Sequence, residues 1–216
     1  MPRPAALLFD LDGTLVDTAP DLARATNALR AHHGLPALPY PAIRAQVSNG
    51  GSALVELALG LARDAPGHDE ARSLLLAAYG EAVAEESCVF PELVPLLAAW
   101  EAAKRPWGIV TNKPRAYAEP LVAALGLSPG ALLCADDLPV KKPDPAPLLE
   151  AARRLAVDPP ACWYLGDHLR DIQAARAAGM PAVAVGWGYV EEGDDYRAWP
   201  ADLWFETGEA LAAALN

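Results

Sequence analysis

Two carboxylates, Asp10 and Asp12, stand one residue apart directly after an apolar run over residues 5–9, and a glycine and a threonine follow them. If the backbone stays extended, side chains two residues apart point to the same side, so both acids face one crevice. Asp10 could attack phosphorus and form an aspartyl phosphate, which divides one difficult hydrolysis into two easier steps. Asp12 could protonate the leaving oxygen and later take a proton from water. Gly13 permits a sharp turn after Asp12.

Polar side chains also follow three later apolar runs. In an open parallel sheet, ligands bind beyond the carboxyl ends of the strands, so we expect these side chains to meet Asp10 at one edge of the sheet. They are Thr111, Asn112 and Lys113 after residues 107–110, Lys141 and Lys142 after a loop that follows residues 131–135, and Asp167 and Asp171 after residues 162–165.

The two acids next to a phosphate dianion would repel it, and the formal net charge of −11 adds to this repulsion at long range. Mg²⁺ offsets such charge and bridges acid to phosphate, so we expect it here with Asp10, Asp12 and Asp167 as ligands. Asp171 lies four residues after Asp167. It could hold a metal-bound water, orient Lys142 by an ion pair, or act only as a helix N-terminal acid.

A second positive element is the pair Lys141 and Lys142, the only adjacent lysines in the chain. Lys142 is expected to give a charge-assisted hydrogen bond to phosphoryl oxygens, while Thr111 offers its hydroxyl and nearby backbone N–H groups. Asn112 is expected to support this arrangement. Lys141 is expected to be a solvated neighbour of the site.

Short apolar runs alternate with segments of helical period along most of the chain. Runs that are apolar on both faces are typical of parallel strands covered by helices on each side, so the pattern predicts an α/β fold with a Rossmann-like, doubly wound parallel sheet. The expected strands are residues 5–9, 107–111, 131–135, 162–166, 182–186 and 203–206, and the expected core helices include 114–125, 147–155 and 169–178.

One region departs from this alternation, because from about residue 17 to residue 86 the apolar pattern is helical with no strand-like run. We interpret it as an inserted small α-helical cap, residues 17–86, on a core domain made of residues 1–16 and 87–216. One helix is expected to begin at residues 18–21, and two further helices are expected to cover residues 52–63 and 68–86.

Substrate contacts are hardest to place, and the first candidates lie in the cap. Asn49, Gly50 and Gly51 precede a helix whose N-terminus could bind an anion, although the segment could also be only a loop. Lys113 is a further candidate in the core. Arg44 and Arg115 could each meet a substrate carboxylate or simply decorate a helix surface. Gly186-Trp187-Gly188 lacks the third glycine of a dinucleotide fingerprint and is expected to shape the loop after its strand, near the site.

Composition excludes several classes of function. With 216 residues, 53% of them hydrophobic, the chain can bury a real core. Its acidic balance and the absence of a Lys/Arg-rich run disfavour nucleic acid, and no stretch approaches membrane-spanning length. The three cysteines lack metal-ligand spacing, and those at 134 and 162 are expected in the core. We expect a reducing cytoplasm as the location. The histidines at 32, 33 and 68 also lack metal spacing and are expected on the solvated surface.

Four segments, FDLDGTLVDT, IVTNK, KKPDP and LGDHLRDI, resemble in order the four motifs of the haloacid dehalogenase (HAD) superfamily of phosphatases. The resemblance covers the whole chain, and the helical insertion is similar to the small cap of subclass I. Asp12 favours phosphate over carbon–halogen chemistry, because dehalogenases of the family lack that second acid. The resemblance implies Asp10 as nucleophile, Asp12 as acid/base and partial metal ligand, Thr111 and Lys142 as phosphate clamp, and Asp167 as metal ligand.

Within that superfamily, TNKP, KKPDPAPLLEA and GWGY resemble phosphoglycolate phosphatases, while longer segments such as PWGIVTNKPRAYAEP and CWYLGDHLRDI resemble N-acetylmuramic acid 6-phosphate phosphatases of bacterial cell-wall recycling more closely. His168 departs from the small or acidic residue expected after Gly-Asp and bears on the outer shell of the metal. The expected substrate is a small phosphorylated sugar acid or hydroxy acid, and the protein is expected to be a monomer or homodimer. A sugar phosphomutase and a non-catalytic partner-binding protein of the same fold are the alternatives.

Overall fold

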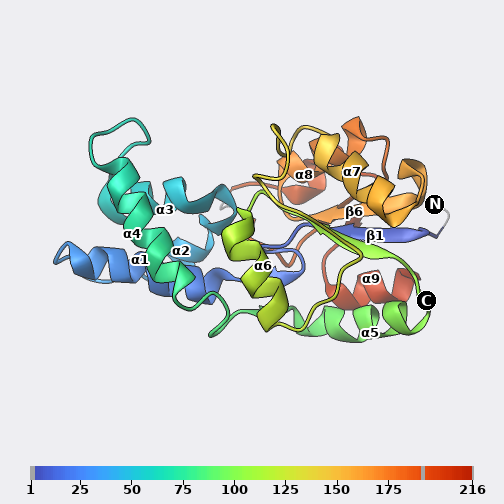
Figure 1. Cartoon of the computed structure of the whole chain (residues 1–216), viewed down its shortest axis with the longest axis horizontal. Helices are drawn as coiled ribbons and strands as arrows, with labels where there is room; N and C mark the ends of the chain where they lie inside the picture. Colours follow the sequence, from blue (N-terminus) through green and yellow to red (C-terminus); the bar gives the residue numbers. More distant parts are fainter. Residues whose placement is uncertain (1–2, 191–192, 216) are drawn as a thin grey trace.

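The computed structural model describes residues 3–190 and 193–215, and its centre is a six-stranded parallel sheet (Figure 1). Residues 1–2, 191–192 and 216 belong to the predicted core domain and lie outside the described residues. All six predicted strands are present, in the spatial order β5-β4-β1-β6-β7-β8. Their bounds are β1 (Ala6–Phe9), β4 (Trp107–Val110), β5 (Ala131–Leu133), β6 (Cys162–Gly166), β7 (Ala182–Val185) and β8 (Leu203–Phe205).

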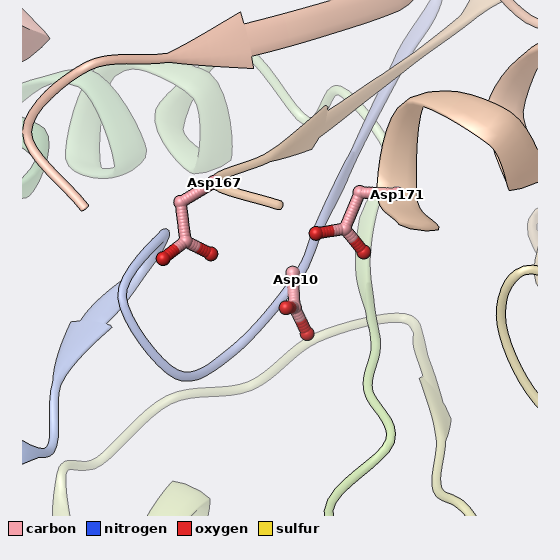
Figure 2. Close-up of side chains that lie close together, drawn as sticks. All are labelled: Asp10, Asp167 and Asp171. Carbon is pink, nitrogen blue, oxygen red and sulfur yellow. The ribbon is translucent and has the colours of Figure 1, made fainter. Parts of the chain in front are cut away.

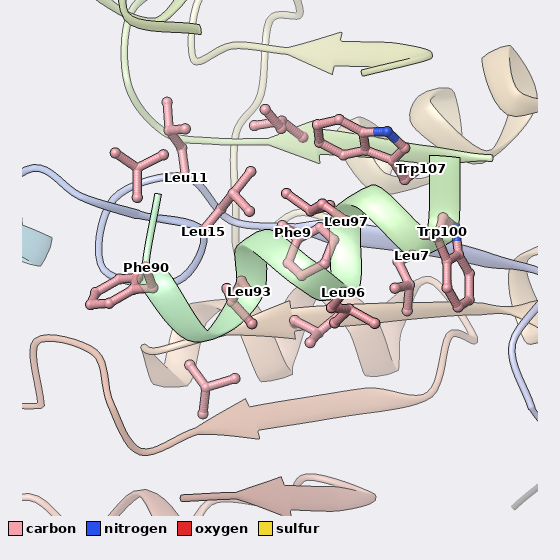
Figure 3. Close-up of a cluster of buried hydrophobic side chains, with 14 of the residues drawn as sticks. Leu7, Phe9, Leu11, Leu15, Phe90, Leu93, Leu96, Leu97, Trp100 and Trp107 are labelled. Carbon is pink, nitrogen blue, oxygen red and sulfur yellow. The ribbon is translucent and has the colours of Figure 1, made fainter. Parts of the chain in front are cut away.

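Helices cover both faces of the sheet, because successive side chains of each strand point to opposite faces and both sets are apolar. Leu7 and Phe9 pack in one buried cluster with side chains of α5, α6 and α9, and Ala6 and Leu8 pack in another with α7 and α8. Figure 3 shows Leu7 and Phe9 with Leu96, Leu97 and Trp100 of α5. Burying one Leu or Phe side chain stabilises the fold by about 1.5–3 kcal/mol. The helices are α5 (Val94–Ala102), α6 (Arg115–Ala124), α7 (Ala146–Leu155), α8 (Leu169–Ala177) and α9 (Gly208–Leu215). The doubly wound α/β fold is confirmed.

Strand β1 lies between β4 and β6, at the point where the strand order changes direction. The chain runs outward from β1 through β4 to β5 and then returns to the other side through β6, β7 and β8. In an open parallel sheet this switch point opens a crevice beyond the carboxyl ends of the central strands. The residues that follow β1, β4 and β6 therefore share one crevice.

The helical insertion, residues 17–86, lies at the opposite end of the molecule from the two termini (Figure 1). Its helices are α1 (Ala19–His32), α2 (Tyr40–Arg44), α3 (Gly50–Leu59) and α4 (His68–Gly80), with a 3₁₀ turn at Val47–Asn49. Leu29, Leu54 and Leu75 belong to its own apolar cluster. The sequence predicted α1, α3 and α4 but missed the five-residue α2, which is too short to show a periodic pattern. The division into a core of 1–16 and 87–216 and a cap of 17–86 stays our proposal.

A short two-stranded antiparallel ladder, β2 (Val16–Asp17) with β3 (Cys88–Val89), forms where the chain enters and leaves the helical insertion. It was not predicted, since two residues per strand carry no readable alternation. Further 3₁₀ turns cover Pro91–Leu93, Pro159–Ala161 and Tyr196–Ala198. No helix within the described residues is long and apolar enough to cross a membrane.

The expectation for the histidines is right at two positions and wrong at the third. His32 and His33 are exposed, whereas His68 is buried at the start of α4, with Nδ1 3.3 Å from Asp69 Oδ1. A single histidine beside charged residues gives no local sign that its helix will turn it inward. The thiols of Cys134 and Cys162 are buried as expected.

Candidate active site

The loop after β1 turns at Gly13 and brings Asp10 and Asp12 to the crevice. Gly13 has φ of +81°, a left-handed conformation that favours glycine. A β-carbon there would lie 2.2 Å from Asp167 Oδ2, so the missing side chain also lets Asp167 approach the loop. Asp10 and Asp12 both line the cavity described below. The predicted role of Gly13 as a turn residue is confirmed.

Three carboxylates converge at the carboxyl ends of β1 and β6. Asp10, Asp167 and Asp171 each offer an oxygen atom, and these atoms all lie within 4.8 Å of one another. Figure 2 shows the three side chains facing a common space from the end of β1, the end of β6 and the start of α8. Asp167 accepts hydrogen bonds from Thr14 Oγ1 at 3.0 Å and from the backbone N–H of Tyr189 at 2.9 Å.

Burial and the charges of neighbouring carboxylates raise the pKa of two of these acids. Burial raises the pKa of Asp167 to about 7, and the charges of Asp10 and Asp171 act in the same direction. Burial also raises the pKa of Asp10 to about 6, although attraction to Lys142 opposes the shift. All three side chains are carboxylates, the ligand type that Mg²⁺ prefers. The residues therefore fit a hard divalent cation.

Lys142 is the cation that the chain itself supplies to this group. Its Nζ lies 2.8 Å from Asp10 Oδ1 and 2.7 Å from Asp171 Oδ1, and it donates to the Tyr164 hydroxyl at 2.7 Å. Burial alone would lower the pKa of Lys142, but attraction to the two carboxylates outweighs it and raises the pKa. Asn112 holds the Lys142 backbone in two hydrogen bonds, donating to its carbonyl at 2.9 Å and accepting from its N–H at 3.1 Å.

Asp171 combines two of the roles considered from sequence. Besides its ion pair with Lys142, its Oδ2 accepts the backbone N–H of His168 at 3.2 Å, and His168 Nδ1 accepts the backbone N–H of Arg170 at 3.1 Å. This reciprocal arrangement is a capping box at the start of α8. His168, the residue that departs from the family pattern, therefore caps the helix that carries Asp171.

Asp12 and Lys113 form an ion pair at the edge of the site. Lys113 Nζ lies 2.8 Å from Asp12 Oδ1, and the Thr18 hydroxyl donates to the same oxygen at 2.6 Å. The Lys113 amine also lies 4.5 Å from the centre of the Tyr79 ring. The Asp12 carboxylate is thus held toward the helical insertion and stands outside the group formed by Asp10, Asp167 and Asp171. Lys113 is buried and paired with Asp12, and it also lines the cavity described below, so its contact with substrate stays a prediction.

A cavity of about 270 Å³ opens over these acids, with walls from the core and from the helical insertion. Thr111 and Asn112 line it from the end of β4, and Lys141 and Lys142 from the loop after β5. The insertion contributes the three predicted residues Asn49, Gly50 and Gly51, and also side chains that the sequence did not single out. Among the latter are Ser48, Leu54, Arg63, Arg72, Leu76 and Tyr79, while the core adds Tyr117 and Arg170.

The two arginines considered for substrate binding lie elsewhere. Arg115 makes two hydrogen bonds to the Asp137 carboxylate, at 2.8 and 2.5 Å. The Arg44 guanidinium stacks 4.8 Å from the centre of the Tyr189 ring and donates to the Trp187 carbonyl at 3.2 Å. Neither arginine is among the residues that line the cavity. Their side chains serve structural contacts in the described residues.

Tyr189 joins the site to the entrance of the helical insertion. Its hydroxyl donates to Asp17 Oδ1 at 2.6 Å and accepts the backbone N–H groups of Thr18 at 2.6 Å and Ala19 at 2.9 Å, while its own N–H binds Asp167. The segment Gly186-Trp187-Gly188 before it does shape a loop next to the site, because a β-carbon at Gly188 would lie 2.2 Å from Asp167 Cβ. The sequence indicated this loop but not the tyrosine.

Comparison with known proteins shows the family to which the chain belongs. A family model described as haloacid dehalogenase-like hydrolase matches residues 4–179. The N-acetylmuramic acid 6-phosphate phosphatase of Pseudomonas aeruginosa is 43% identical over 203 residues, covering 93% of this chain and 90% of that protein. A phosphoglycolate phosphatase of Xanthomonas campestris is 40% identical over 205 residues, covering 94% and 92%. A solved structure from Haemophilus somnus, described as a predicted phosphoglycolate phosphatase, matches with a TM-score of 0.84 at 26% identity over 100% of both chains. The chain therefore belongs to the haloacid dehalogenase-like hydrolases, and among them to the phosphatases.

Proposed function

We propose that the protein is a Mg²⁺-dependent phosphomonoesterase that works through an aspartyl phosphate on Asp10. The observation that carries this proposal is the position of Asp10, which faces the cavity while Lys142 Nζ lies 2.8 Å from its Oδ1 and two further carboxylates stand beside it. The ion pair favours the charged, nucleophilic form of Asp10 that burial would otherwise disfavour. A cation held by Asp10 and Asp167 would neutralise the acids and the phosphate oxygens.

The chain's own residues provide each proton transfer that hydrolysis needs. An Asp10 oxygen attacks phosphorus while the bond from phosphorus to the ester oxygen breaks, and Asp12 gives that oxygen a proton. Asp12, now ionised, then takes a proton from the water that attacks phosphorus and frees Asp10 and inorganic phosphate. The hydrogen bond from Thr18 holds the Asp12 side chain in place, and Lys113 stabilises the ionised form that takes the proton from water. Thr111 and Lys142 bind the phosphoryl oxygens in this proposal.

We propose a phosphorylated sugar acid, N-acetylmuramic acid 6-phosphate, as the substrate, and thus a place in cell-wall recycling. One observation favours it over the smaller 2-phosphoglycolate. The Pseudomonas aeruginosa relative bears this name at 43% identity. Phosphoglycolate remains the second candidate, because the Xanthomonas campestris relative at 40% identity carries that name.

Phosphate release in the presence of Mg²⁺ tests the proposal. We expect kcat/KM for N-acetylmuramic acid 6-phosphate to exceed that for 2-phosphoglycolate by more than about 100-fold, or roughly 2.7 kcal/mol in the transition state. Asp10→Asn should abolish turnover. Asp158→Asn removes the same charge from an exposed position before β6 and should leave turnover unchanged.

Three other outcomes would replace the proposal with an alternative. Preference for 2-phosphoglycolate would make the enzyme a phosphoglycolate phosphatase. Conversion of sugar phosphates without free phosphate would indicate a phosphomutase. Turnover no higher than that of Asp10→Asn would favour a partner-binding protein that keeps the fold. We further propose that the enzyme works in the cytoplasm as a monomer or homodimer on a small phosphate ester.

A further inference from the structure

Four basic side chains at the cavity form no ion pair within residues 3–190 and 193–215, although the chain is strongly acidic. The lack of an acidic partner within the described residues is unusual, because acidic residues outnumber basic ones in this chain by 28 to 17. Most other basic side chains near the cavity are engaged, as Lys113 is by Asp12 and Lys142 by Asp10 and Asp171. The four are Arg63, Arg72, Lys141 and Arg170.

These four side chains divide between the two walls of the cavity. Lys141 and Arg170 belong to the core, directly beside Lys142 and Asp171 in the chain, and Arg170 Nη2 also donates to Asn49 Oδ1 of the insertion at 3.4 Å. Arg63 and Arg72 belong to the helical insertion, which forms the opposite wall. A ligand whose phosphate lies against Asp10 would therefore turn its remaining groups toward Arg63 and Arg72.

Arg72 lies next to a further source of positive potential. Its Nε lies 3.7 Å from the place where a β-carbon of Gly51 would be, at the start of the ten-residue helix α3. The side chain of Asn49 does not cap this helix. Helix N-termini present backbone N–H groups and a partial positive charge that favour anions. Gly51, with no side chain, keeps this helix start open beside the guanidinium.

We propose that Arg63 and Arg72 form a subsite for a second anionic group of the substrate, a carboxylate remote from the phosphate ester. This inference rests on the proposed function, in which the phosphate is held at Asp10. A guanidinium presents a planar fork of donors that matches a carboxylate in two parallel hydrogen bonds. A substrate carboxylate would supply the counter-charge that these two arginines lack in the described residues, and a neutral sugar phosphate would not.

The subsite explains how an acidic protein can select an acidic substrate. The net charge of −11 repels anions at long range. Salt at physiological ionic strength largely screens the interaction between solvent-exposed charges that are more than about 8 Å apart. Local arginines therefore decide the outcome once the ligand has entered. The core supplies the reaction and the insertion selects for the acid group.

Two sugar phosphates that differ in the acid group alone provide the test. N-acetylmuramic acid 6-phosphate carries a lactyl carboxylate, and N-acetylglucosamine 6-phosphate is the same sugar phosphate without it. We expect Arg72→Gln to lower kcat/KM for the first by about 10- to 100-fold, the range of a lost hydrogen bond to a charged group. The second should change by less than about 3-fold, which also shows that the variant is folded. Arg63→Gln should act in the same direction.

Arg153→Gln is the matched control, since it removes an exposed arginine on α7 that does not line the cavity. It should change neither substrate. Equal losses for both sugars, or no loss for either, in Arg72→Gln and Arg63→Gln would overturn the subsite. So would a wild-type protein that hydrolyses both sugars equally, and in that case the phosphatase assignment stands. If the wild-type protein cleaves 2-phosphoglycolate and neither sugar phosphate, the proposed substrate fails and the subsite fails with it.

Discussion

Removal of one hydroxyl group, in Tyr189→Phe, tests how the core holds the helical insertion. Tyr189 is 1% exposed, and its hydroxyl bonds to three groups at the start of the insertion: Asp17 Oδ1 and the N–H groups of Thr18 and Ala19. Phenylalanine keeps the ring and its packing. The substitution therefore isolates the hydrogen bonds from the apolar contacts.

The magnitude follows from the groups that lose a partner. Thr18 and Ala19 are both fully buried, so water cannot take the place of the hydroxyl. Ala19 N–H still has Asp17 Oδ1 at 3.3 Å, which leaves the Thr18 N–H and the short bond to Asp17 as the losses. A buried polar group left unsatisfied costs about 1–3 kcal/mol. The Thr18 N–H is such a group, and the lost hydrogen bond to the Asp17 carboxylate adds about 1.5–3 kcal/mol, so we expect a loss of roughly 2.5–6 kcal/mol in the free energy of unfolding.

Urea unfolding followed by far-ultraviolet circular dichroism measures this loss, and Tyr79→Phe is the matched control. Tyr79 is equally buried at 1% exposure, but its hydroxyl has no hydrogen-bond partner in the described part of the chain. Deleting that hydroxyl should change the free energy of unfolding by less than about 1 kcal/mol. A loss in Tyr189→Phe below about 1 kcal/mol, or equal losses in both variants, would refute the reasoning.

Two further predictions concern the acids. Gly13→Ala should raise the Mg²⁺ concentration needed for half-maximal activity, because its β-carbon would lie 2.2 Å from Asp167 Oδ2. Gly126→Ala is the control: with φ of +66° and nothing within 4 Å of its β-carbon, it carries a similar backbone strain without that contact. An unchanged half-saturating Mg²⁺ concentration in Gly13→Ala would contradict the assignment of Asp167. The second prediction is a pH dependence of the stability of metal-free protein. The pKa of Asp167 is raised from 3.8 to about 7, so between those pH values the folded state keeps a proton that the unfolded state has released. The contribution of this group to the free energy of unfolding therefore falls as pH rises through that window. Thermal unfolding in EDTA should thus show Asp167→Asn gaining stability relative to wild type from about pH 4 to pH 7, and a constant difference would count against it.

Local sequence was sufficient for the sheet and for the acids at its edge. Each predicted strand is a run that is apolar on both faces, as burial between two helical layers requires, although β8 at the sheet edge leaves Trp204 exposed. Asp10 and Asp167 could be placed because parallel strands end at one edge, so a residue that follows a strand lies in the crevice. The shortest elements, α2 and the β2–β3 ladder, were missed because a few residues carry no period.

Contacts between distant segments were beyond the reach of the sequence. The contacts of Asp12 with Lys113 and Thr18 depend on side-chain directions that two loops set together. The same holds for Arg63 and Arg72, which the sequence did not single out and which line the cavity in the structure.

The sequence by itself thus determined the sheet, the order of its strands along the chain and the residues at their carboxyl ends, since each depends on a local pattern. Only the tertiary structure decided which arginines face the cavity, why His68 is buried and how Tyr189 ties the core to the insertion. Those features depend on the packing of helices and loops far apart in the chain, and their energies exist only once those surfaces meet.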